Sequence, residues 1–138
     1  MVKTESRIGE IKESDEKIFQ YLSNFNHFKS LIPADKIKDF KSSWDTCSFT
    51  VEGIGELGLR IIEKDPNKLI KISSDETTPF EFLMWIQIKE LSKDESRMRI
   101  TVEVKINPMM ATMVKTPLKT FVDTLIDQAE KISYDPDL

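Results

Sequence analysis

Hydrophobic and polar residues alternate strictly between positions 97 and 106. Charged or hydroxyl side chains separate the apolar positions, which are Met98, Ile100, Val102, Val104 and Ile106. A period of two predicts a strand with one apolar face and one face in water. From Met110 to Ile132 the apolar residues instead recur every three or four positions, after Asn107 and Pro108. This spacing predicts one long amphipathic helix that covers the sheet with its apolar side, Met110 and Met113 included.

The beginning of the chain predicts an edge strand followed by two short helices. Weak alternation within residues 2–13 indicates the strand. Ser14 can cap the first helix, whose apolar stripe consists of Ile18, Phe19, Leu22 and Phe25. The second short helix contains Phe28 and Leu31 and should end before Pro33, because the residue that precedes a proline disfavours helical geometry.

Strand patterns fill the middle of the chain. Residues 47–51 alternate, and Gly53, Gly55 and Gly58 then predict a turn into a strongly bent strand. Asp65-Pro66-Asn67 predicts another turn, and further strands are predicted at residues 69–73 and 80–88. The order of elements predicts an α+β protein, an antiparallel sheet with one apolar face under the last helix.

This order of elements, together with three local stretches, resembles the START/Bet v 1-like (SRPBCC) superfamily. The first stretch is Leu31-Ile32-Pro33 leading into residues 37–40, and the second is the glycine-containing segment 51–57. The third is Asn107-Pro108, which opens the long helix that contains residues 121–125. None of these stretches is a catalytic signature, so the resemblance concerns the fold.

The resemblance implies a single domain over residues 1–138 with the helix-grip fold. In that fold a curved antiparallel sheet, here expected to have about six strands, wraps around a long C-terminal helix, and two short helices follow the first strand. Members typically bind a hydrophobic or amphipathic small molecule between the concave sheet and the C-terminal helix. They include lipid-transfer domains, hormone-binding proteins, cyclases and chaperone-activating domains, so the fold alone does not choose a function.

Strand parity, the methionine-rich start of the long helix and the resemblance together suggest which residues line such a cavity. Pro117 has no N–H to donate to the carbonyl of Met113, which predicts a kink or break of the helix at this point. The flexible methionine side chains beside it could then adapt to an apolar ligand. The alternatives are that the methionines fill the core and that Phe25 and Phe28 form a packed contact. The cavity-lining candidates are Phe25, Phe28, Phe49, Phe82, Met84, Val102, Val104, Met109, Met110, Met113, Pro117 and Phe121.

The sequence predicts no catalytic residue, metal site or cofactor. His27 and Cys47 are the single histidine and the single cysteine, and two such ligands are too few for a zinc centre. Cys47 lies on the same side of its strand as the apolar residues Phe49 and Val51, which favours an inert buried thiol. The ionisable residues of the strands occupy the alternate positions, which should face water. They are Glu52, Glu81, Lys89, Glu103 and Lys105.

The composition of the chain limits the classes of binding partner that we expect. The formal net charge is −4 and the 20 lysines and arginines form no basic block, which argues against a nucleic-acid partner. No stretch reaches the length of a membrane-spanning helix, so membrane insertion is not expected. The single cysteine and the lack of a signal-peptide pattern at the N-terminus predict a cytoplasmic location.

Three functions remain open at this point. The first is non-catalytic binding or transport of a small hydrophobic or amphipathic ligand, supported by the apolar parity of the predicted cavity wall. The second is a cyclase- or hydratase-type enzyme that uses the same cavity. The third is a protein-interaction module like the chaperone-activating domains. Leu83 and Trp85 share the outer parity of their strand, which suggests a homodimer through the outer sheet face.

Overall fold

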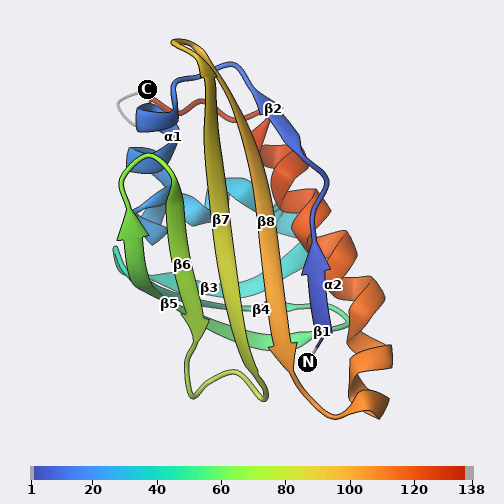
Figure 1. Cartoon of the computed structure of the whole chain (residues 1–138). Helices are drawn as coiled ribbons and strands as arrows, with labels where there is room; N and C mark the ends of the chain where they lie inside the picture. The colour runs from blue at the N-terminus through green and yellow to red at the C-terminus, as the bar shows by residue number, and fades with distance from the viewer. Residues whose placement is uncertain (1, 136–138) are drawn as a thin grey trace.

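The computed structural model describes residues 2–135, which form an antiparallel sheet around one long helix (Figure 1). The strands are β1 (Val2–Glu5), β2 (Gly9–Ile11), β3 (Ile37–Ser42), β4 (Thr46–Val51), β5 (Gly55–Asp65), β6 (Leu69–Ser74), β7 (Glu81–Ser92) and β8 (Glu95–Lys105). The helices are α1 (Asp15–Leu22), the 3-10 helices η1 (Phe25–Leu31) and η2 (Ala34–Lys36), and α2 (Pro108–Ala129).

The sheet has the strand order β1-β8-β7-β6-β5-β4-β3, and β2 also pairs with β8. Every pairing is antiparallel. Figure 1 shows the sheet curving from β7 and β8 in front to β3 and β4 behind, with α2 along β1 and β2. This is the α+β helix-grip fold expected from the sequence.

Over residues 2–135 the sheet has eight strands rather than about six. One reason is that the predicted first strand is interrupted at Ser6, whose hydroxyl and backbone N–H both bond to Ile100 on β8. The strand therefore becomes β1 and β2. Another reason is that β3 begins at Ile37 and pairs with β4, with a register shift between Lys38 and Lys41.

The helix boundaries follow the predicted caps. The side chain of Ser14 accepts a hydrogen bond from the backbone N–H of Lys17, and Asn107 accepts one from Met110. Between β4 and β5, Gly53 and Gly55 have φ of 87° and 113°, a left-handed conformation that glycine adopts without a Cβ clash.

The core lies between the concave face of the sheet, the short helices and one side of α2. The inner strand positions are buried, as the period of two predicts, and Ile70, Ile72, Ile86, Ile100 and Val104 are fully inaccessible to solvent. On α2 the buried stripe consists of Ala111, Val114, Leu118, Phe121, Val122, Leu125, Ile126 and Ala129.

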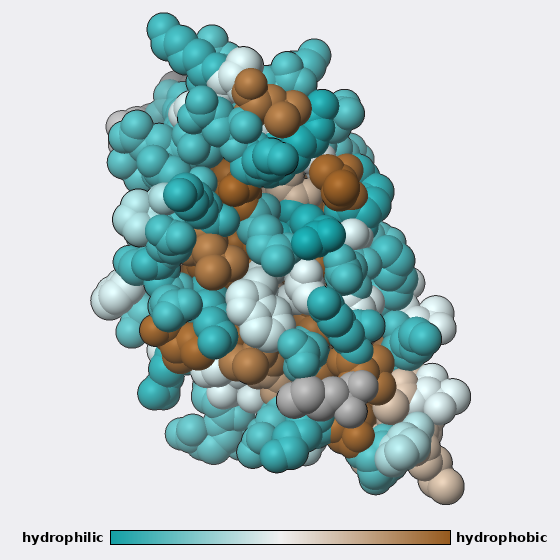
Figure 2. Space-filling view, viewed as in Figure 1, coloured by the Kyte–Doolittle hydropathy of each residue, from teal (hydrophilic) through white to brown (hydrophobic). Residues whose placement is uncertain are grey.

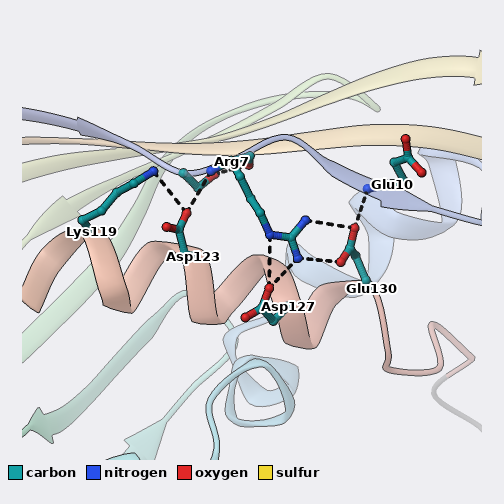
Figure 3. Close-up of polar contacts among 7 residues, drawn as sticks. Arg7, Glu10, Lys119, Asp123, Asp127 and Glu130 are labelled. Atoms are coloured by element: carbon teal, nitrogen blue, oxygen red, sulfur yellow. Dashed lines mark hydrogen bonds and ion pairs between the residues drawn. The ribbon is translucent and has the colours of Figure 1, made fainter.

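A polar cluster on α2 fixes this helix to the segment that joins β1 and β2 (Figure 3). The backbone N–H of Arg7 donates to Asp123 at 2.9 Å, and its guanidinium binds Asp127 and Glu130. Glu130 also accepts a hydrogen bond from the backbone N–H of Glu10 at 2.8 Å. The three carboxylates lie on one side of α2 because they are spaced by four and three residues.

Candidate functional site

The interior between the sheet and α2 is filled by side chains. Among the described residues, a small cavity in this interior measures about 10 Å³ and is lined by Leu57, Phe80, Phe82, Met84, Val102, Leu118 and Phe121. A cavity of this size is at the lower limit for one water molecule. Four of the residues predicted to line a ligand cavity therefore do come together here, but the space they surround is too small for a ligand. They are Phe82, Met84, Val102 and Phe121.

The other aromatic candidates are packing residues of this core. Phe25 and Phe28 are buried and make an edge-to-face contact with ring centroids 5.1 Å apart. They therefore form a packed contact in the core, which the sequence left open as the alternative to lining a cavity. Phe49 lies 6.1 Å from Phe121, centroid to centroid. Val104 is buried on the inner sheet face and does not line the internal cavity.

The methionines at the start of α2 do not face the sheet. Met109, Met110 and Met113 are 80%, 45% and 73% exposed, so the expectation that they line an internal cavity is corrected. The helical rotation of about 100° per residue places Met109 and Met113 opposite the buried stripe, whereas Met110, four residues before Val114, lies at the edge of that stripe and is the least exposed of the three. Ala111 and Val114 take the inward positions of this segment, which leaves Met109 and Met113 on the outer side. Figure 1 also shows the first turn of α2 extending past the end of β1.

Of the kink or break predicted at Pro117, the break is absent, since α2 runs continuously from Pro108 to Ala129. Leu118 and Phe121 directly after the proline are buried against the core. Their packing holds the helix together although Pro117 donates no hydrogen bond to Met113.

An open cleft of about 370 Å³ lies beside α2, where the helix faces the short 3-10 helices and the end of β4. Its volume is within the usual range for small-molecule sites. One wall is α2 itself and the other comes from residues more than sixty positions earlier in the chain. The lining residues are Ile32, Pro33, Lys36, Val51, Glu52, Thr116, Pro117, Thr120, Phe121, Thr124 and Leu125.

Phe121 connects the cleft with the core, because it lines both the cleft and the internal cavity. Pro117 and Phe121 are the two predicted site residues that lie in the cleft. The sequence does contain a signal for the rest of the α2 wall. Thr116, Thr120 and Thr124 are spaced by four residues and run parallel to Pro117, Phe121 and Leu125.

Lys36 and Glu52 are the ionisable side chains among the residues that line the cleft. The buried titratable groups lie elsewhere. Burial, followed by the charge of Asp75, raises the pKa of the Cys47 thiol to about 12. Burial likewise raises the pKa of Tyr134, whose hydroxyl donates to the carbonyl of Ala129 at 2.5 Å. Both groups are therefore neutral at physiological pH.

Within residues 2–135 no group of three or more histidine, cysteine, aspartate or glutamate side chains gathers where it could hold a metal ion. The single histidine has a structural environment. Nδ1 of His27 lies 2.8 Å from the backbone oxygen of Tyr21, and the His27 ring stacks on the Tyr21 ring.

The outer face of the sheet is mostly hydrophilic, with separate hydrophobic patches (Figure 2). Leu83 and Trp85 are half-buried there, and the ammonium group of Lys71 lies 5.8 Å from the centre of the Trp85 ring. The lysine therefore covers part of the surface that the sequence suggested for a homodimer. Self-association through this face stays a prediction.

Among the described helices, none is both long and apolar enough to cross a membrane.

Neither a protein-family model nor a curated protein matches this chain. Solved structures do match over almost the whole chain. A START superfamily protein from Mycobacterium smegmatis has a TM-score of 0.65 and 17% identity, covering 95% of this chain and 99% of its own. A truncated norcoclaurine synthase from Thalictrum flavum has a TM-score of 0.68 and 16% identity, covering 96% of both chains.

The Aha1 dimer from Colwellia psychrerythraea is similar as well, with a TM-score of 0.61, 23% identity and coverage of 95% and 98% of the two chains. A synthase and an Aha1 protein thus share one architecture with this chain. These likenesses show that the chain has the helix-grip fold of the START/Bet v 1-like (SRPBCC) proteins. Since the same fold serves different functions, the function has to be argued from the cleft.

Proposed function

We propose that this protein binds a small amphipathic molecule in the cleft beside α2. The observation that carries the proposal is the cleft itself, with about 370 Å³ of open space next to a core that has almost none. Apolar side chains and hydroxyl groups line it, as is usual for small-molecule sites. The binding place is therefore at the side of α2 rather than inside the sheet.

Binding without chemistry is favoured by the character of the walls. A cyclase or hydratase needs an acid or base in contact with the reacting atoms. The cleft lining contains one lysine and one glutamate, Lys36 and Glu52, and both are exposed to solvent rather than held in the buried setting that tunes catalytic acids and bases. The buried groups with raised pKa, Cys47 and Tyr134, do not line the cleft.

The proposal is tested by filling the cleft. Thr120 is exposed and lines the cleft, so Thr120→Trp should occupy the space without disturbing the core. Thr112→Trp is the matched control, because Thr112 is exposed on the same helix outside this cleft. Fluorescence titration with 1-anilinonaphthalene-8-sulfonate should show probe binding in the wild type and in Thr112→Trp. The affinity should fall at least about tenfold in Thr120→Trp, the change expected when about 1.4 kcal/mol of binding free energy is lost.

Equal probe binding in the wild type and in Thr120→Trp would contradict the proposal. In that case the outer sheet face near Leu83 and Trp85 would become the surface to test. Native mass spectrometry of the protein as purified from cells, followed by denaturing extraction, would then identify the class of any molecule that stays bound.

A further inference from the structure

The α2 wall of the cleft carries a row of hydroxyl groups. Thr116, Thr120 and Thr124 all line the cleft and are successive i, i+4 neighbours on the helix. A rise of 1.5 Å per residue places neighbours about 6 Å apart, so the row is about 12 Å long. The length is comparable to that of a rigid molecule of two or three rings.

These hydroxyls are free to bind a ligand. A threonine in a helix commonly satisfies its hydroxyl on the carbonyl four residues earlier, and Thr112 does so, donating to Pro108 at 3.1 Å. Within the described part of the chain, the hydroxyls of Thr116, Thr120 and Thr124 make no hydrogen bond with another residue. The three threonines that line the cleft thus differ from Thr112, one turn earlier, whose hydroxyl is already bonded within the helix.

Apolar side chains lie beside and opposite this row. Pro117, Phe121 and Leu125 form a parallel stripe on α2, displaced by one residue from the threonines. Ile32, Pro33 and Val51 supply apolar surface from the other wall. A molecule in the cleft therefore meets apolar surface over its body and hydroxyls along one edge.

Resting on the proposed function, we infer that the cleft selects a rigid, largely apolar molecule that carries hydroxyl or similar hydrogen-bonding groups along one edge. Thr116, Thr120 and Thr124 are the specificity-determining residues, because a threonine hydroxyl can both donate to and accept from such groups. A molecule without these groups would take the hydroxyls out of water without a partner, which opposes its binding.

The test compares two ligands with the same body. Resveratrol carries three hydroxyls on the stilbene frame and 4-hydroxystilbene carries one, and the fluorescence of each reports its own binding. Each satisfied hydrogen bond changes affinity by roughly two- to tenfold. The wild type should therefore bind resveratrol at least about fourfold more tightly than 4-hydroxystilbene.

The variants assign this preference to the hydroxyl row. Thr116→Val, Thr120→Val and Thr124→Val combined should abolish the preference, since valine keeps the shape and removes the hydroxyl. The corresponding triple serine variant keeps the hydroxyls and should retain the preference. Thr112→Val is the control outside the cleft and should behave as the wild type. Circular dichroism confirms that each variant is folded.

Three outcomes would overturn the inference, and they separate it from the proposed function. If both stilbenes bind equally, or if the valine variant keeps the preference, the cleft binds ligands but the threonine row does not select them. If neither stilbene nor 1-anilinonaphthalene-8-sulfonate binds to the wild type, both the inference and the proposed function are wrong.

Discussion

The guanidinium of Arg7, between β1 and β2, binds the carboxylate of Glu130 at the end of α2, with Nη2 and Oε1 2.6 Å apart. The two residues are 123 positions apart in the sequence. This contact joins the N-terminal edge of the sheet to the C-terminal end of the helix. It therefore helps to hold α2, and with it one wall of the cleft, in place.

The first prediction is a pH dependence of stability that comes from Glu130. The hydrogen bond from Arg7 is the main cause that lowers the pKa of Glu130 below its usual 4.5. A lowered pKa in the folded state stabilises the protein above the unfolded value, and this stabilisation is lost as the pH falls through the folded value. Glu130→Gln should reduce the free energy of unfolding by about 1 kcal/mol at pH 7, since the ion pair is partly exposed.

The difference between wild type and Glu130→Gln should shrink as the pH falls below about 4.5. Urea unfolding at pH 7 and at pH 3.5 measures it, with Glu63→Gln as a control at an exposed position on β5. A difference that stays constant between the two pH values would mean that the carboxylate charge is not responsible.

The second prediction concerns the close approach of β2 to α2. A Cβ placed on Gly9 would lie 2.7 Å from Cγ2 of Ile126, which is completely buried. Gly9→Ala should therefore destabilise the fold by about 1–3 kcal/mol, the usual effect of overpacking. Ile126→Leu removes the γ2 methyl group, so the double variant should lose less stability than the sum of the single variants. Chemical denaturation of the four proteins gives the coupling energy, and strict additivity would contradict this contact.

The third prediction concerns Phe121, the residue shared by the cleft and the internal cavity. Phe121→Ala should lower the free energy of unfolding by about 3–5 kcal/mol and open an apolar space between them. Benzene should then raise the melting temperature of the variant, because a dry apolar cavity binds such molecules. The wild type, with a cavity of about 10 Å³, should show no shift. Phe121→Leu serves as a milder variant, and an equal benzene effect in variant and wild type would contradict the filled interior.

The fourth prediction is that Cys47 is unreactive in the native protein. Its thiol is buried, and its pKa is raised to about 12, chiefly by burial. The reactive thiolate is therefore nearly absent at pH 8. Reaction with 5,5′-dithiobis(2-nitrobenzoic acid) should proceed only as fast as the protein opens, and at once in urea. Stoichiometric reaction of the folded protein within seconds would show that the thiol is accessible.

The regular elements could be predicted from the sequence because their signals are local. The alternation around Val102 gives β8, and the alternation around Met84 gives β7. Asn107 and Pro108 mark the start of α2, since a cap and a proline at the first helical position act on the same turn. In these cases neighbouring residues contain all the necessary information.

The position of the binding site could not be predicted in this way. Strand parity shows that Phe82 and Met84 point inward, but not whether the space between the sheet and α2 is filled. The cleft joins Pro33 and Thr120, which lie 87 positions apart, so it depends on how α2 packs against the short helices. The helical spacing also assigned Met110 to the apolar stripe, although its side chain is 45% exposed in the first turn of α2.

The nearly complete filling of the core has a consequence for the response of this protein to hydrostatic pressure. Pressure unfolds proteins largely because unfolding eliminates internal voids, and the volume change of unfolding scales with the void volume. The cavity between the sheet and α2 has room for about one water molecule, so a large hydratable void does not add to this volume change. A member of the same fold with a large hollow interior would lose far more volume on unfolding. This chain should therefore remain folded at pressures that unfold hollow proteins of equal thermal stability.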